Sequence, residues 1–176
     1  MLMEFEELEA NRHQMNISKE NVEYIRDIIK KNKLKNVLEI GCFNGYSALQ
    51  FSTVAKEVKT IEIDKHAVET AKNNFKKYNI KNIEKLEGDA KTILDNLRET
   101  FDVILIDAMK SEYKAYLVKS LKLVKNGSFI FADNTISHKD KMKDFFDYLK
   151  SSKLNWKELG IGKKDYGISG LVEIRI

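Results

Sequence analysis

The chain has 176 residues, of which 43% are hydrophobic and 33% are charged, a balance that favours one globular domain and argues against disorder. Lys and Arg number 31 against 27 Asp and Glu, and the resulting net charge of +4 is too mild to require a nucleic-acid partner. The single cysteine, Cys42, excludes an intrachain disulfide and a cysteine-based zinc cluster.

The longest apolar runs are much shorter than the ~20 residues that cross a bilayer. The acidic, amphipathic first residues also differ from a secretory signal. We therefore expect a soluble, cytoplasmic protein with no membrane partner.

The hydrophobic pattern predicts an alternation of helices and strands. A short helix is expected over Glu4–Arg12, and a second one begins at the N-cap Ser18 and runs to about Lys31. The other elements are expected, in chain order, as a strand at 36–40, a helix at 46–55, a strand at 58–63, a helix at 65–78, a strand at 83–86, a helix at 90–97, a strand at 101–106, a helix at 111–124, a strand at 128–132, a helix at 139–151, and strands at 156–159 and 171–176.

Near-continuous apolar strands separated by helices are typical of a parallel sheet covered on both faces. The last two strands are joined by a glycine-containing loop without a helix, which favours an antiparallel hairpin. We therefore predict one doubly wound α/β domain over residues 1–176. In such sheets, ligands bind at the carboxyl ends of the strands.

The loop after the first strand contains two glycines, Gly41 and Gly45, which let the chain turn tightly and let backbone N–H groups approach a ligand. Bulky Phe43 stands where a pyrophosphate-binding loop needs a small residue, which favours a cofactor without phosphates. Glu62 follows Gly41 at about the 20-residue separation expected of an acid that binds ribose hydroxyls. The alternative is a plain turn with acids that cap helices, a role that suits Asp64.

Asp89 follows the third strand. It is placed to accept a hydrogen bond from an adenine amino group or to cap the next helix, and the sequence leaves both roles open.

Oxygen-bearing side chains follow the fourth and fifth strands. Asp107, Asp133 and Asn134 supply two carboxylates and an amide carbonyl, which suit Mg²⁺ far better than zinc. Lys110 lies three residues after Asp107, and a nearby cation would lower its pKa and make it a credible general base. Helix caps and a solvated lysine are the alternative interpretation.

Together these segments resemble class I S-adenosylmethionine (SAM)-dependent methyltransferases, specifically the metal-dependent catechol O-methyltransferase-like branch. The resemblance covers most of the chain. The segments that carry it are Met15–Ile17, Glu39–Ala48, Thr60–Ile63, Asp107–Tyr113 and Ala132–Asn134.

The resemblance implies a Rossmann-like fold with strand order 3-2-1-4-5-7-6 and strand 7 antiparallel, in agreement with the terminal hairpin. Residues 1–35 would form N-terminal helices and a short lid, and residues 36–176 the core. Asp107, Asp133 and Asn134 would hold Mg²⁺ or another divalent cation, and Lys110 would deprotonate the acceptor hydroxyl. The implied cofactor-binding residues are Asn16, Ile17, Glu39, Gly41, Phe43, Gly45, Ser47, Glu62, Ile63, Asp89, Ala90 and Asp107.

The chain departs from the family in its acceptor-binding positions. Equal spacing places His13 and Met109 where the catechol enzyme has tryptophans, and Lys163 where it has a late acidic residue. These differences disfavour catechol itself. We expect a small hydroxylated acceptor and a minimal lid, with a hydroxylated uridine in tRNA as the alternative. His13 and His138 would either border the acceptor pocket or lie on the surface.

Two other classes of function stay open at this stage. A nucleotide-dependent oxidoreductase shares the architecture, although Phe43 disfavours it. A regulatory module that binds SAM without turnover is the other alternative. A homodimer is compatible with each of them.

Overall fold

The computed structural model describes residue 5, residues 7–8 and residues 13–176. The helix expected over Glu4–Arg12 falls largely outside these residues.

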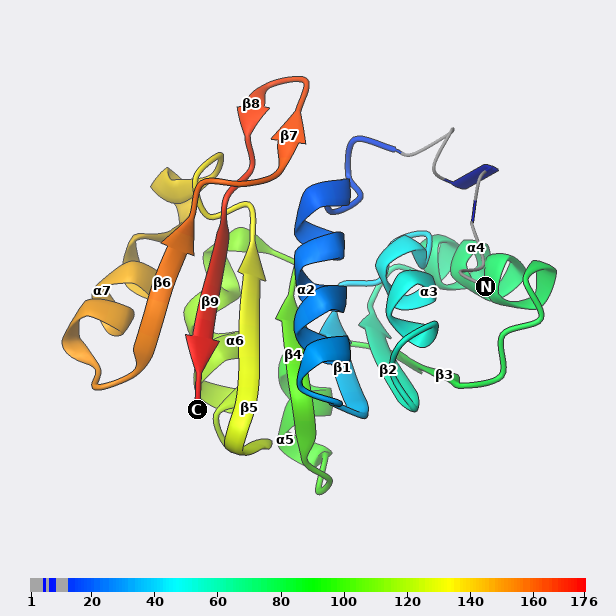
Figure 1. Cartoon of the computed structure of the whole chain (residues 1–176), viewed down its shortest axis with the longest axis horizontal. Helices are drawn as coiled ribbons and strands as arrows, with labels where there is room; N and C mark the ends of the chain where they lie inside the picture. The colour runs from blue at the N-terminus through cyan, green and yellow to red at the C-terminus, as the bar shows by residue number, and fades with distance from the viewer. Residues whose placement is uncertain (1–4, 6, 9–12) are drawn as a thin grey trace.

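Seven strands form one sheet in the order β3-β2-β1-β4-β5-β9-β6 (Figure 1). Neighbouring strands are parallel except that β9 runs antiparallel to both β5 and β6. Because β9 is the seventh strand of this sheet along the chain, the predicted order and the antiparallel strand are confirmed. The strands are β1 (Asn36–Ile40), β2 (Glu57–Glu62), β3 (Ile83–Glu87), β4 (Phe101–Ile106), β5 (Val124–Asp133), β6 (Asn155–Leu159), β7 (Lys163–Lys164), β8 (Gly167–Ile168) and β9 (Leu171–Arg175).

Helices cover both faces of the sheet (Figure 1). Residues of α2, α3 and α4 pack in the apolar cluster on one face, and those of α5, α6 and α7 pack in the cluster on the other. The helices are α2 (Lys19–Lys31), α3 (Tyr46–Ser52), α4 (Lys65–Lys77), α5 (Ala90–Asn96), the 3-10 turn η1 (Lys110–Glu112), α6 (Tyr113–Ser120), the 3-10 turn η2 (Lys139–Met142) and α7 (Lys143–Ser151).

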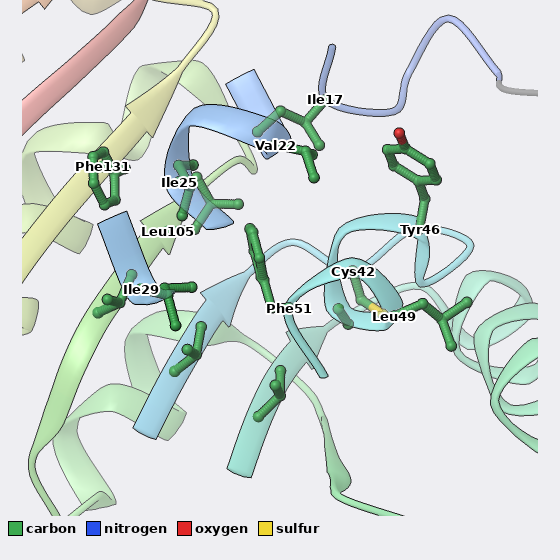
Figure 2. Close-up of a cluster of buried hydrophobic side chains, with 14 of the residues drawn as sticks. Ile17, Val22, Ile25, Ile29, Cys42, Tyr46, Leu49, Phe51, Leu105 and Phe131 are labelled. Carbon is green, nitrogen blue, oxygen red and sulfur yellow. The ribbon is translucent and has the colours of Figure 1, made fainter. Parts of the chain in front are cut away.

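Helix α2 lies directly on the sheet. Ser18 begins it by accepting a hydrogen bond from the backbone N–H of Asn21. Its buried side chains include Ile25 and Ile29, which face Leu105 and Phe131 of the sheet (Figure 2). Helix α2 is therefore part of the hydrophobic core.

Three predicted helices are shorter than expected by more than one residue. The helix from Tyr46 ends at Ser52, because the hydroxyls of Ser52 and Thr53 bond to carbonyls of its last turn. The predicted 111–124 helix begins with η1 and ends at Ser120, since Leu123 already accepts a bond from Phe101 N and sheet pairing begins at Val124. The predicted 139–151 helix begins with the 3-10 turn η2, a common form for a first helical turn.

The loop between β6 and β9 contains a feature that the sequence did not indicate. Its residues form the β7–β8 hairpin, which projects beyond the sheet edge where the parallel strands end (Figure 1). Within the described ranges, no helix is both long and apolar enough to span a membrane.

Candidate functional site

The predicted site residues at the ends of β4 and β5 belong to one hydrogen-bond network. Lys110 Nζ donates to Asp107 Oδ1 at 2.8 Å and to the hydroxyl of Tyr113 at 2.8 Å. That hydroxyl donates in turn to the backbone oxygen of Asp133 at 3.1 Å. Two strand ends and the turn after β4 are thereby brought together.

Asp133 is fully buried at the end of β5. Burial, followed by the charge of Asp107, raises the pKa of Asp133 above its ordinary value. One carboxylate oxygen, Oδ1, accepts from Asn21, while Oδ2 is buried and has no hydrogen-bond partner among the described residues. A buried anionic oxygen without a donor is costly unless a cation or another ligand contacts it.

Asn134 lies beside Asp133 in the left-handed region, at φ 62°, a conformation that Asn tolerates better than most residues. Its Nδ2 donates to Ser169 Oγ at 3.0 Å, so the side-chain carbonyl oxygen points away from that bond. The unpaired Asp133 oxygen, the Asp107 carboxylate and this carbonyl are hard oxygen donors at the neighbouring ends of β4 and β5. Their chemistry fits a divalent cation such as Mg²⁺.

The glycine loop packs tightly against the end of β4. Gly41 has φ 97°, and a Cβ added to it would lie 2.1 Å from the backbone oxygen of Asp107. Gly45 has φ 82°, and a Cβ there would lie 2.5 Å from the ring of Phe75 in α4. Only glycine fits at either position, because both the backbone conformation and the space exclude a side chain.

Glu62 ties this loop to the end of β2. Its Oε2 accepts from the backbone N–H groups of Cys42 and Phe43 at 3.1 and 2.9 Å. Its Oε1 accepts from those of Ile63 and Asp64 at 2.9 and 3.0 Å. The carboxylate predicted to bind ribose therefore also fixes the conformation of the loop.

Glu39 lies beneath the loop and is fully buried. It accepts hydrogen bonds from the hydroxyls of Ser47 and Thr60, the latter at 2.6 Å. Burial raises the pKa of Glu39 to about 8 although these two bonds oppose the shift.

The segment before α2 lies over the glycine loop. The rings of His13 and Phe43 are 5.2 Å apart, and Ile17 packs in the same apolar cluster as Cys42 and Tyr46 (Figure 2). Asn16 is buried, and its Nδ2 has no partner within the part of the chain that the structure describes. A ligand bound beside the loop would satisfy this buried donor.

The remaining predicted cofactor residues lie at the ends of β2 and β3. Gly88 N donates to Glu62 O at 2.8 Å, which brings these ends together. Ile63 is 65% exposed, an unusual position for a large apolar side chain. Asp89 caps α5 by accepting from Lys91 N at 2.7 Å, while Ala90 is the first residue of that helix.

Sequence reasoning missed two polar residues of the site, Asn21 and Ser169. Both are fully buried, and both donate to Asp133 Oδ1, at 2.6 and 3.3 Å. The signal for Asn21 was its position on the buried stripe of α2, one helical turn before Ile25, where an apolar residue is expected. No comparable signal pointed to Ser169.

Several large apolar side chains that lie close in the sequence to residues of the site are exposed, and we call them the apolar rim. The β7–β8 hairpin meets the segment before α2 through Gln14 Nε2, which donates to Asp165 at 2.6 Å. The ring of His138, beside the site, packs edge-on against that of Tyr166 at 6.2 Å. Burial, then the charge of Lys110, lowers the pKa of His138. The apolar rim consists of Met15, Met109, Ile136, Tyr166 and Ile168.

This strand order, with its antiparallel β9, glycine loop and acidic strand ends, defines a Rossmann-like methyltransferase fold. The crystal structure of the O-methyltransferase TomG of Streptomyces achromogenes, involved in tomaymycin synthesis and solved in complex with SAM, matches it with a TM-score of 0.88. That match covers 100% of this chain and 92% of the other at 19% identity.

A model of the O-methyltransferase family matches residues 2–155. Caffeoyl-CoA O-methyltransferase 2 of Populus trichocarpa is 32% identical over 148 residues, which are 77% of this chain and 60% of the relative. The O-methyltransferase ankF of Aspergillus thermomutatus is 38% identical over 115 residues, which are 59% of this chain and 47% of the relative. The chain thus spans about half to three fifths of the length of these relatives. It belongs to the O-methyltransferase family.

Proposed function

We propose that this protein is a SAM-dependent O-methyltransferase that uses a divalent cation, with Mg²⁺ as the first candidate. The acceptor is a small molecule that carries a hydroxyl beside a second oxygen. Family membership and the SAM bound to the TomG structure support the cofactor and the reaction. They also favour methyl transfer over the oxidoreductase alternative.

The observation that carries the metal assignment is the buried, unpaired Oδ2 of Asp133 beside the Asp107 carboxylate. Asp107, Asp133 and Asn134 would hold the cation. When bound, it supplies a positive charge that lowers the pKa of a coordinated hydroxyl.

The protein's own groups handle the proton and the positioning. Lys110, in its neutral amine form, would receive the acceptor's proton at Nζ, and its bond with Tyr113 fixes the direction of the amine. Glu62 keeps the glycine loop in the conformation that a nucleoside would contact. Bound SAM supplies the activated methyl group, and holding the acceptor oxygen in line with it is the main task of the site.

The acceptor class rests on the apolar rim, which suits a flat aromatic ring, and on the name of the poplar relative. The β7–β8 hairpin contributes two positive charges, Lys163 and Lys164, which would attract an acceptor with anionic groups. Such an acceptor and a hydroxylated uridine of tRNA are therefore included in the test. The homodimer and the cytoplasmic location stay predictions.

The test is transfer of a labelled methyl group from SAM, with Mg²⁺ or with EDTA, to small catechols, caffeoyl-CoA and bulk tRNA. We expect transfer to a small acceptor that EDTA abolishes. Transfer to tRNA alone would replace the acceptor class, and S-adenosylhomocysteine (SAH) binding without any transfer would favour the non-catalytic module.

The matched variants are Asp133→Ala and, as control, Asp147→Ala on the exposed surface of α7. Asp133→Ala should lose turnover and retain SAH affinity, while Asp147→Ala should resemble the wild type. Equal loss of turnover and SAH affinity in Asp133→Ala would contradict the metal assignment.

A further inference from the structure

Asn21 occupies a position in α2 where a polar side chain is unusual. It is fully buried on the face that packs against the sheet. The chain also closes tightly around it, since a Cβ added to Gly162 would lie 2.7 Å from Asn21 Oδ1. A buried amide in such a confined place needs strong polar partners.

The main partner of Asn21 is the carboxylate of Asp133, 112 residues away in the sequence. Asn21 Nδ2 donates to Asp133 Oδ1 at 2.6 Å and reaches the backbone oxygen of Gly170 at 3.4 Å. Because Oδ1 is engaged in this way, the rotation of the carboxylate is fixed. The other oxygen, Oδ2, is left buried and without a donor in the described part of the chain.

Ser169 adds a second constraint. Its hydroxyl donates to the same Asp133 Oδ1 at 3.3 Å and accepts from Asn134 Nδ2 at 3.0 Å. Both donors thus converge on one oxygen of Asp133, while the amide nitrogen of Asn134 is held away from the oxygens expected to bind a cation. One hydroxyl therefore orients two of the three candidate ligands.

We propose that Asn21 and Ser169 are positioning residues that hold Asp133 Oδ2 and the carbonyl oxygen of Asn134 in the orientation that binds a divalent cation. This inference rests on the metal site of the proposed function. Outer hydrogen-bond partners of metal ligands act in this way, and their removal weakens metal binding about 10- to 100-fold.

The experiment measures Mn²⁺ binding by electron paramagnetic resonance and SAH binding by calorimetry on the full chain. We expect Asn21→Ala and Ser169→Ala to bind Mn²⁺ at least about tenfold more weakly. SAH affinity should stay within about threefold of the wild type. Ser169→Ala removes a single oxygen atom, so it tests the inference even if Asn21→Ala does not fold.

Two control variants remove comparable polar groups away from the site. Asn82→Ala removes an amide that donates to Ser52 O at 3.0 Å, and Ser128→Ala removes a buried hydroxyl that donates to Phe101 O at 3.0 Å. Both should keep wild-type Mn²⁺ affinity.

Unchanged Mn²⁺ affinity in both site variants would overturn the inference and leave the metal site standing. Parallel losses of Mn²⁺ and SAH affinity in site and control variants would also overturn it, since they would indicate a general structural effect. A wild-type protein that binds no Mn²⁺ would instead overturn the metal site of the proposed function, and this inference with it.

Discussion

The amine of Lys110 lies 2.8 Å from Oδ1 of Asp107, three residues earlier in the same strand-end turn, and both side chains are mostly shielded from solvent. Burial lowers the pKa of Lys110, but the charge of Asp107 and the hydrogen bonds with Asp107 and Tyr113 raise it by more. A general base must be neutral, so Lys110 can accept a proton only when another cation engages the Asp107 carboxylate.

Replacing Lys110 tests this role. Lys110→Ala should lower kcat by about 100-fold or more, the usual contribution of a positioned base, with SAH affinity unchanged. The control is Lys114→Ala, an exposed lysine in the helix that follows. A wild-type pH profile of kcat in Lys110→Ala would exclude the residue as base.

Gly41→Ala should destabilise the protein and impair cofactor binding, because the new Cβ would lie 2.1 Å from the Asp107 backbone oxygen. We expect a loss of about 3 kcal/mol in the free energy of unfolding. Gly127→Ala is the matched control: its φ of 89° is also positive, but nothing lies within 4 Å of its added Cβ. It should cost only the backbone strain of about 1 kcal/mol. Urea unfolding measures both variants. Equal losses in the free energy of unfolding for Gly41→Ala and Gly127→Ala would show that the close approach of Gly41 to Asp107 does not matter for stability.

Glu62→Ala should weaken SAH binding about tenfold or more, because the ribose would lose its proposed charged partner and the loop residues Cys42 and Phe43 would lose the acceptor of their N–H groups. Asp64→Ala serves as the control. It removes the cap of α4, which accepts from Ala67 N at 2.8 Å, and should cost about 1 kcal/mol of stability without changing SAH affinity. Calorimetry measures the SAH affinity of both variants. A wild-type SAH affinity in Glu62→Ala would rule out Glu62 as the ribose-binding residue.

The raised pKa of Glu39 predicts that the free energy of unfolding depends on pH. Its pKa is about 8 in the folded protein, against 4.5 for an ordinary Glu, so the folded state holds the proton more tightly. The contribution to stability is therefore fully present below pH 4.5 and is lost as the pH rises through about 8, with a slope of up to about 1.4 kcal/mol per pH unit. Glu39→Gln should remove this slope from urea-unfolding data collected between pH 5 and pH 8. Parallel wild-type and variant curves would contradict the shift.

Much of the fold was predictable because its signals are local. The apolar runs of β1 and β4, and the loop without a helix before Leu171, led to the parallel sheet and the antiparallel β9. The β7–β8 hairpin was not predictable, since its strands contain two residues each and carry no periodic pattern.

The candidate site was likewise predictable only where the signal is local. Asp107, Asp133 and Glu62 were predicted as site residues because they lie at strand ends, and strand ends meet at one edge of a parallel sheet. The contact of Asn21 with Asp133 joins residues 112 positions apart, and no local spacing encodes it. The hydrogen bonds that Glu62 accepts from the glycine loop likewise depend on the register of two neighbouring strands, β1 and β2.

Helix α2 seals the apolar layer with Ile25 and carries the amide that reaches Asp133. The position of α2 on the sheet and the orientation of the Asp133 carboxylate therefore depend on each other. Because α2 is part of the hydrophobic core, its detachment would disrupt the apolar layer and release Asp133 in the same step. The temperature at which the proposed cation binding is lost should therefore coincide with the global melting temperature.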